Sequence, residues 1–515
     1  MPEAKLVPAY NEEDDRRPYR PMRIPAFAAV VAGCLAIVAL WVSGQSFWID
    51  ECNAAVKAIQ PDLRSFWTKF SGMGGSDFQM PLYMFLLWCW EKIAGRGEFA
   101  LRALNVLFAW SAILLVAFRT ALPRRFRLLW CVAAAVSPML AVYMDEARPY
   151  ALQFLAATAL YLPFLSFPEK DCTDGFDFRT FSIGLILLCG SSLTGVVFAF
   201  WPCLWLSILL ARSRMLLRFV AGHGMWIAVD AVLLALLAGF YLHTLASGAR
   251  ASAVSGTSLS STIFCAYEFL GFMGAGPSRL ALRSAQGSAL RAYLLPLASM
   301  SAASGLFLLA AIASRSRISD CGRTQHSIRP RIPVLLSLAG VLSMLFVGVT
   351  MEMRVLARHL MPALPAFLFL FSGVAVRLLA SAPWRRVAVA VLFLAWISSA
   401  VAFRFSPRHA KDDYRRACGI ARSALSEGKV VWWAADQASV EFYFADVAAC
   451  ADRLVPLMNP SDDDLSEAPS VDIAILSKPD VYDRGGAVRR HLTDNGFRRT
   501  ESFSAFSVFE RGAIR

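Results

Sequence analysis

The chain has 515 residues, of which 57% are hydrophobic and 17% are charged. Soluble domains carry about a quarter charged residues, so this composition excludes an ordinary soluble protein. The formal net charge of +13 does not indicate nucleic acid, because most arginines lie in short segments between apolar blocks, as in membrane proteins. We therefore expect the lipid bilayer as a partner, and no nucleic acid.

About eleven apolar blocks approach the length of about 20 residues that a helix needs to cross a bilayer. The first block follows a polar, cytoplasmic tail at 1–24. It is read as an uncleaved helix because no small-residue cleavage site precedes the next loop. The block 181–211 is too long for one span, so we divide it near Ser191 and Ser192. The predicted spans are 25–43, 98–118, 128–144, 150–167, 181–192, 194–211, 220–243, 292–313, 332–350, 359–379 and 385–402.

The apolar segment 80–94 decides which way the spans run. As a helix it reaches only about 22 Å, short of the roughly 30 Å hydrocarbon core, so we expect it to lie in the membrane interface. With this segment excluded, the arginine-rich segments at 119–127, 212–218, 315–331 and 377–386 share one face with the N-terminal tail. The positive-inside rule makes that face cytoplasmic, so the chain is predicted to start inside and end outside.

Several segments are then expected to meet on the external face of the transmembrane domain, 25–402. They are the loops 44–97, 145–149, 244–291 and 351–358, and the tail 403–515. The tail is predicted to form a small α/β domain of about 110 residues, which is within the usual domain size. Its predicted helices are 412–426 and 487–495, and its predicted strands are 430–433, 471–476 and 503–509.

Two acids stand just after the first span, in the sequence Trp48-Ile49-Asp50-Glu51. A carboxylate at the membrane surface can act as a general base on an attacking hydroxyl of a substrate held at the interface. The alternative is a solvated loop with two ordinary acids. The local pattern alone favours that alternative.

Charged residues at the ends of other spans are predicted to join this loop. Asp145, Glu146, Arg148 and Tyr150 connect the third and fourth spans, where charges are costly unless they are paired or functional. A helix cap with an arginine reaching to the interface is the alternative. Before the tenth span stand Arg354, Arg358 and His359. Guanidinium groups pair well with phosphate oxygens, although lipid headgroups are an alternative partner. The loop 244–291 carries further arginines, Arg250, Arg279 and Arg283, and its length is typical of a lid or binding loop.

Six short stretches within roughly residues 25–420 match the motifs of a known family in order and spacing. They are Phe47–Glu51, Asp77–Tyr83, Gly95–Arg102, Ser137–Leu152, Arg358–Pro362 and Lys411–Arg415. In this series the chain resembles the membrane-embedded GT-C glycosyltransferases that use polyprenyl-phosphate-linked sugars. That group includes protein O-mannosyltransferases and the aminoarabinose transferases that modify lipid A. The chain departs from the family at Gln79-Met80-Pro81-Leu82-Tyr83, where members commonly have His-Pro-Pro-Leu-Tyr.

The resemblance implies a GT-C-like fold and a transferase that moves a sugar to an acceptor hydroxyl on the external face, with inversion. It implies that Asp50 is the base, assisted or oriented by Glu51. Substrate contacts are assigned to Asp77, Tyr83, Asp145, Glu146, Arg148, Tyr150, Arg354, Arg358 and His359. The implied partners are a polyprenyl-phosphate-sugar donor and a glycolipid, polysaccharide or protein acceptor. A divalent metal is compatible with these residues but not required, and no metal ligands are assigned.

Two functions from other classes remain open. A polytopic transporter would use an acid inside the membrane, and Asp230 in the seventh span is the one clear candidate. A glycan-assembly subunit would use the external domain to bind a partner without catalysis. The overall pattern favours a bacterial inner membrane as the location.

Overall fold

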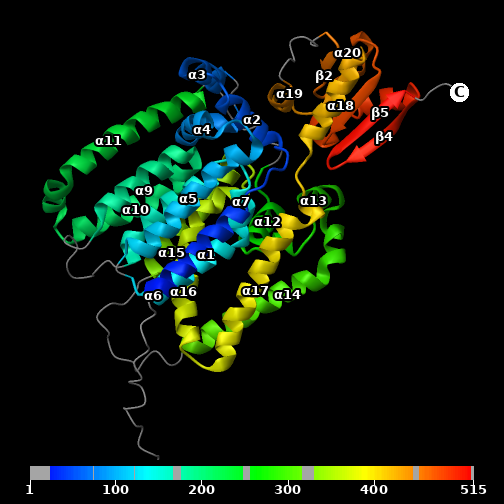
Figure 1. Cartoon of the computed structure of the whole chain (residues 1–515). Helices are drawn as coiled ribbons and strands as arrows, with labels where there is room; N and C mark the ends of the chain where they lie inside the picture. Colours follow the sequence, from blue (N-terminus) through cyan, green and yellow to red (C-terminus); the bar gives the residue numbers. More distant parts are fainter. Residues whose placement is uncertain are drawn as a thin grey trace, which may run out of the picture.

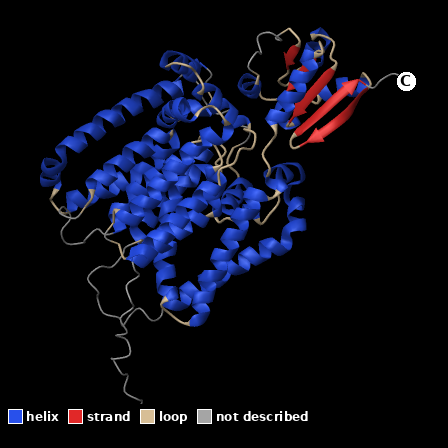
Figure 2. Ribbon diagram, viewed as in Figure 1, coloured by secondary structure: helices blue, strands red, loops and turns tan. Residues whose placement is uncertain are grey.

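The computed structural model describes residues 24–72, 75–120, 122–165, 176–246, 256–315, 330–444 and 452–511. In these ranges the chain forms a large helix bundle and a smaller α/β domain that sits at one end of it (Figure 1). The strands assigned there all belong to the smaller domain (Figure 2). Most of the predicted cytoplasmic tail, and Arg250, lie outside the described residues.

Each predicted span coincides with a helix of the bundle, and one span is shared by two helices. The bundle helices are α1 (Ile24–Leu40), α5 (Glu98–Phe118), α6 (Arg124–Val136), α7 (Pro138–Met144), α8 (Tyr150–Tyr161), α9 (Phe178–Ser191), α10 (Leu193–Arg212), α11 (Leu216–Ala246), α14 (Leu294–Arg315), α15 (Arg331–Thr350), α16 (Leu364–Leu379) and α17 (Pro383–Phe405). In the part of the chain that the structure describes, seven helices are long and apolar enough to cross a membrane, or eight if the bent α6–α7 pair is one span. Three more, including α1, are shorter apolar helices. The polytopic helical architecture is confirmed, and the count of eleven spans stays a prediction.

Two breaks in the helices follow from local chemistry. As predicted, the long block 181–211 is interrupted at Ser192, whose extended backbone separates α9 from α10. The predicted span 128–144 is bent by 53° between α6 and α7. Pro138 has no backbone N–H to continue α6, so it starts a new helix, and the Ser137 hydroxyl accepts a hydrogen bond from Leu140 N at 3.4 Å.

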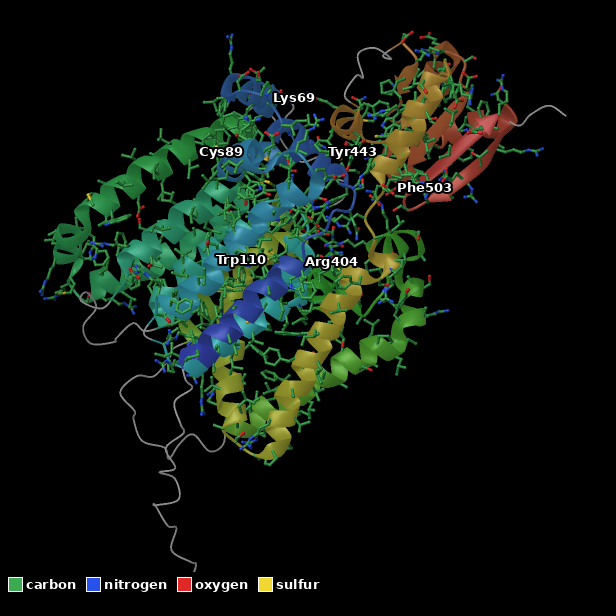
Figure 3. All side chains as sticks on the ribbon, viewed as in Figure 1. Lys69, Cys89, Trp110, Arg404, Tyr443 and Phe503 are labelled. Atoms are coloured by element: carbon green, nitrogen blue, oxygen red, sulfur yellow. The ribbon has the colours of Figure 1, made fainter. Side chains whose placement is uncertain are left out.

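The bundle combines close helix contacts inside with large apolar side chains outside. A Cβ added at Gly184 of α9 would lie 2.5 Å from Leu160 N of α8, so only glycine permits this approach. Trp110 of α5, labelled in Figure 3, donates its indole N–H to Leu35 O of α1 at 2.8 Å. Large apolar side chains such as Leu217 and Leu236 of α11 point outward, as expected of a surface that faces lipid.

The segment 44–97 forms short helices at the end of the bundle that also carries the α/β domain (Figure 1). They are α2 (Ile49–Ala58), α3 (Leu63–Gly72), η2 (Ser76–Gln79) and α4 (Pro81–Ala94). The helix expected at 80–94 is therefore confirmed, and its position in the membrane interface stays a prediction. It buries Tyr83, Met84 and Leu87 and leaves Ile93 exposed. The other connecting helices are α12 (Leu259–Phe269), η4 (Phe272–Gly274), α13 (Arg279–Ala285), η5 (Gln286–Tyr293), η6 (Ala357–Ala363) and η7 (Pro407–His409), with η3 (Leu162–Leu165) extending α8.

The C-terminal domain is a five-stranded mixed sheet in the order β2-β1-β3-β5-β4. Strands β1 (Val431–Ala434), β2 (Leu454–Pro456) and β3 (Ile473–Ser477) are parallel. Strands β4 (Phe497–Phe503) and β5 (Phe506–Arg511) form an antiparallel hairpin on β3. The helices are α18 (Tyr414–Ser426), α19 (Gln437–Tyr443), α20 (Asp462–Glu467), α21 (Pro479–Tyr482) and α22 (Ala487–Asp494).

The strands β1 and β3 are buried on both faces of the sheet. Trp433 packs in one apolar cluster with α18, whereas its neighbour Trp432 packs in a second cluster with α22, as strand alternation requires. The predicted α/β domain is thus present, with the helices and the first two strands close to their predicted positions. The predicted strand 503–509 instead spans the turn of the hairpin, because the exposed residues Arg498 and Arg499 of β4 give no apolar signal.

Candidate active site

Asp50 and Glu51 both lie in the first turn of α2, where the helix dipole favours negative charge. Successive residues of an α-helix point about 100° apart. Two adjacent acids in a helix therefore face different surroundings. In this chain the difference is large.

The carboxylate of Asp50 is partly open, with 22% of the side chain exposed. Its Oδ2 accepts a hydrogen bond from Arg358 of η6 at 2.7 Å, and Arg358 also lies over the ring of Trp48 at 5.7 Å. Burial raises the pKa of the Asp50 carboxyl, but the charges of Arg358 and Arg148 outweigh it, so the pKa falls below its usual value. Asp50 is therefore ionised at neutral pH.

Glu51 is completely buried and accepts four hydrogen bonds. Its Oε1 accepts from Arg102 Nε at 2.7 Å and from the backbone N–H of Ala147 at 2.8 Å. Its Oε2 accepts from Arg102 at 2.8 Å and from Lys411 Nζ at 2.9 Å. Burial opposes its charge, but Arg102 and Lys411 lower the pKa of Glu51 to about 2. The acceptor sites of this carboxylate are occupied, so Glu51 is suited to hold these segments together rather than to react.

Asp145 completes what we call the Glu51 cluster (Glu51, Arg102, Asp145 and Lys411). It accepts from Ser43 N at 2.6 Å and Ser43 Oγ at 2.9 Å, and it lies 3.5 Å from Lys411 Nζ. Arg102 also donates to the carbonyls of Ser43 and of residues 45 and 46. The cluster joins the end of α1, the start of α2, α5, the loop 145–149 and the C-terminal domain.

A second buried group holds the backbone of Asp50. Arg148 pairs with Asp77, which also lies 2.8 Å from Lys57 Nζ. Arg148 donates to the carbonyl of Asp50 at 3.3 Å and to Ser76 Oγ at 3.0 Å. Asp77 and Arg148, both predicted to bind substrate, therefore connect the segment 44–97 to the loop 145–149.

Glu146 belongs to a third group, which lies against the loop after α12. Its Oε1 lies 3.3 Å from Arg279, which is also 3.0 Å from Glu268 and 3.2 Å from the hydroxyl of Tyr143. Tyr143 packs edge-to-face on Tyr150, at 5.0 Å between ring centroids. Burial raises the pKa of the Glu146 carboxyl, and Arg279 only partly offsets this effect.

Arg354 and His359, both predicted to bind substrate together with Arg358, do not reach Asp50. Arg354 is exposed. His359 accepts a hydrogen bond from Leu356 N through Nδ1 at 3.2 Å, and so caps its own helical turn. Of the three, Arg358 is the one that reaches Asp50.

Four buried polar side-chain atoms of residues 48–83 and 145–149 have no hydrogen-bond partner in the part of the chain that the structure describes. They are Trp48 Nε1, Tyr83 OH, Glu146 Oε2 and Arg148 Nε. Tyr83 is fully buried, and burial raises the pKa of its hydroxyl well above the usual value. Unpaired buried polar atoms are costly, so each of these four atoms is a candidate for a contact with a bound ligand.

The C-terminal domain adds residues that the sequence did not single out. Lys478 lies over Trp48, at 5.9 Å from the ring centroid, and pairs with Asp412 at 2.5 Å. Asp436 accepts from Asn53 of α2 at 3.4 Å, and burial raises the pKa of Asp436 to about 6. Lys411 and Arg102 were noticed only as parts of matching motifs. Glu268 and Lys57 gave no sequence signal.

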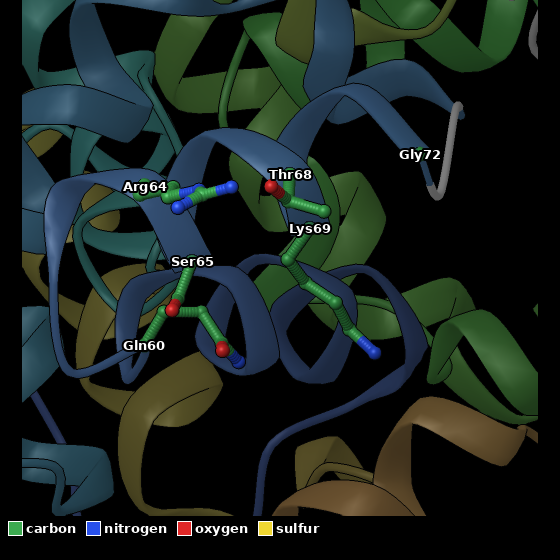
Figure 4. A pocket seen from close by; sticks show the side chains of 6 residues that line it. All are labelled: Gln60, Arg64, Ser65, Thr68, Lys69 and Gly72. Carbon is green, nitrogen blue, oxygen red and sulfur yellow. The ribbon is translucent and has the colours of Figure 1, made fainter.

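Two surface cavities lie close to these elements. One, of about 530 Å³, is formed by the end of α2 and by α3, and its lining contains none of the predicted site residues (Figure 4). The other, of about 640 Å³, lies between residues 44–46 and the C-terminal domain, with Lys411 in its wall.

Within the described ranges no group of three or more His, Cys, Asp or Glu side chains could hold a metal ion. Asp230 accepts a hydrogen bond from Ser182 Oγ at 2.7 Å, which joins α11 to α9.

No family model matches the chain, and no curated protein sequence matches it. Solved structures do match. ArnT from Cupriavidus metallidurans, crystallised with undecaprenyl phosphate, aligns with a TM-score of 0.52 over 95% of this chain and 98% of its own, at 12% identity. The arabinofuranosyltransferase AftD from Mycobacteria aligns with a TM-score of 0.45 over 96% of this chain and 40% of its own, at 14% identity. At 12% identity the likeness to ArnT shows the fold alone: the chain has the polytopic GT-C-type fold that its motifs predicted.

Proposed function

We propose that the protein is a membrane glycosyltransferase that moves a sugar from a polyprenyl-phosphate-linked donor to an acceptor hydroxyl. The observation that carries the proposal is the state of Asp50. It is ionised, partly exposed and held by one arginine, at the end of a GT-C-type bundle where the loops converge. The ArnT structure contains undecaprenyl phosphate, which supports a lipid phosphate as the leaving group.

In the proposed reaction Asp50 takes the proton of the acceptor hydroxyl. The hydroxyl oxygen bonds to the anomeric carbon of the sugar while the bond from that carbon to the phosphate oxygen breaks. Arg358, next to Asp50, pairs with the phosphate as it leaves with the bonding electrons. A direct displacement of this kind inverts the anomeric configuration. A carboxylate beside the anomeric carbon also stabilises the positive charge that develops there.

The unpaired polar atoms supply candidate contacts to the substrate. Tyr83 OH and Arg148 Nε are donors, and Glu146 Oε2 is an acceptor when ionised or a donor when protonated. Sugar hydroxyls provide partners for all three. Glu51 and Asp145, in contrast, are proposed to orient the segment that carries Asp50 rather than to touch the substrate.

The reaction is tested with the purified protein in lipid nanodiscs. Undecaprenyl-phosphate-linked sugars with a labelled sugar are supplied, and transfer or release of undecaprenyl phosphate is measured. We expect turnover by the wild type and none above background by Asp50→Asn. Nucleotide sugars, offered as alternative donors, should give no turnover. Turnover by Asp50→Asn equal to the wild type would disprove the role of Asp50.

We further propose that the site faces the outside of a bacterial inner membrane, with the N-terminus cytoplasmic. The clustering of the loops with the C-terminal domain at one end of the bundle supports a common side for these segments. In a variant without native cysteines, single cysteines are placed at Gly72 and Ala382, both exposed. An impermeant thiol reagent should label position 72 from outside and position 382 only after the membrane is opened. Labelling of both from the same side would refute the orientation.

A further inference from the structure

The C-terminal domain is docked on the loop that carries Asp50. The hydroxyl of Tyr443, labelled in Figure 3, accepts a hydrogen bond from Phe47 N at 2.9 Å. Phe442 packs edge-to-face on Phe47, at 5.2 Å between ring centroids, and Ala438 joins the apolar cluster of α2 and α4. Polar and apolar contacts together fix the domain against the bundle.

Lys478 reaches the Asp50 site from this docked domain. It follows β3 and precedes Pro479, with a left-handed backbone (φ 40°) that is uncommon for a lysine. Its side chain is only 9% exposed, which is low for a lysine, and it pairs with Asp412. Strained backbone at a buried cation is typical of a residue held in place for a function.

Trp48 links Lys478 to the proposed phosphate ligand. Arg358 and Lys478 both lie over its ring, at 5.7 and 5.9 Å from the centroid. The indole N–H of Trp48 is buried and has no partner among the described residues. Two cations and an unused donor thus surround one aromatic ring, and the charges of both cations act on Asp50. This arrangement suits an anion with several oxygen atoms.

We propose that Lys478 is a substrate-binding residue that shares with Arg358 the phosphate of the donor, so that the C-terminal domain forms part of the active site. This inference rests on the proposed function, because it assigns a second cation to the same phosphate. Lys478 belongs to the C-terminal domain, whereas Arg358 belongs to the bundle. Docking of that domain is therefore required for tight donor binding.

The experiment measures binding of radiolabelled undecaprenyl phosphate to the full-length protein in nanodiscs, with undecaprenol as the uncharged reference. The variants are Lys478→Met, Lys478→Arg and Arg358→Met. Lys429→Met is the matched control, since Lys429 is an exposed lysine of the same domain that pairs with Glu427. Loss of one charge-assisted contact should weaken undecaprenyl phosphate binding by roughly 10- to 100-fold in Lys478→Met. Binding of undecaprenol should stay unchanged, Lys478→Arg should bind within about threefold of the wild type, and Lys429→Met should match the wild type.

The outcomes separate the two proposals. If the wild type binds undecaprenyl phosphate no better than undecaprenol, the proposed function fails. If the wild type discriminates between them and Lys478→Met discriminates equally well, the function stands and the role of Lys478 is refuted. A lower melting temperature of Lys478→Met with unchanged discrimination counts as refutation too, because it shows a purely structural lysine. Weaker binding that Lys478→Arg does not restore also contradicts the proposal.

Discussion

Asp50 and Glu51 are neighbours in the chain, but their carboxylates differ in burial and in the number of hydrogen bonds they accept. Glu51 is fully buried, with four donors on its two oxygens. Asp50 is 22% exposed, and among the described residues its carboxylate pairs with Arg358. We expect the closed region to stabilise the fold, and the proposed mechanism uses the open carboxylate as the base. The pKa of both acids is lowered, so exposure, more than acidity, distinguishes the two carboxylates.

The largest expected effect separates the two acids by activity. Asp50→Asn keeps the shape of the side chain but removes the base, so transfer should fall by about 10²- to 10⁴-fold. The melting temperature should change little, because the side chain is partly exposed. It is measured on the same preparation as the transfer rate. A large loss of stability in Asp50→Asn would show that Asp50, like Glu51, stabilises the fold.

The next effect is on stability. Glu51→Gln removes the carboxylate that accepts two hydrogen bonds from the buried Arg102, and breaking such a pair costs about 3–5 kcal/mol. Glu441→Gln is the matched control, since Glu441 forms an exposed pair with Lys69, worth about 0–1 kcal/mol. Chemical unfolding in detergent compares the two variants. Equal losses in both would show that the Glu51 cluster is not an anchor.

A third prediction concerns the pH dependence of transfer. Arg358 lowers the pKa of Asp50, so the base remains ionised as the pH falls toward that lowered value. In Arg358→Met the lowering charge is lost while burial remains, and the pKa of Asp50 should rise. The acidic limb of the rate profile should therefore move to higher pH in the variant. An unmoved acidic limb, with a reduced maximal rate, would indicate that another group is titrating.

The smallest expected effect is a loss of stability at low pH that depends on Glu51. The pKa of Glu51 is lowered from 4.5 to about 2 in the folded protein, so its stabilisation is complete above about pH 4.5 and is lost as the pH falls toward 2. Melting temperatures of the wild type should therefore fall across this window, and those of Glu51→Gln should fall less. If the melting temperatures of the two proteins fell equally with pH, Glu51 would not contribute to the loss of stability in acid.

Much of the fold could be predicted from the sequence because apolar length and arginine placement are local properties. The break at Ser192 and the meeting of the loops with the C-terminal domain were found in this way. The exposed edge strand β4 was missed, since Arg498 and Arg499 hide the alternation that marks a half-buried strand.

The site was predictable only in part. Asp50 and Arg358 come together as expected, because each lies where a span ends. Glu146 instead pairs with Arg279. Lys478 could not be found, since its place depends on how a distant domain packs. The division of labour between Asp50 and Glu51 depends on Arg102, whose direction from α5 no local pattern gives.

The position of Lys411 in the chain has a consequence for how the protein is made. Glu51 and Lys411 are 360 residues apart, so at roughly 5–20 residues per second the ribosome needs about 20 to 70 s to supply the second after the first. Until then Glu51 and Asp145 face the single positive charge of Arg102 within the cluster. The entrance to the bundle therefore reaches its final charge balance only when the last helix is inserted and the C-terminal domain emerges. A chain that ends before Lys411 would keep one uncompensated negative charge in the Glu51 cluster.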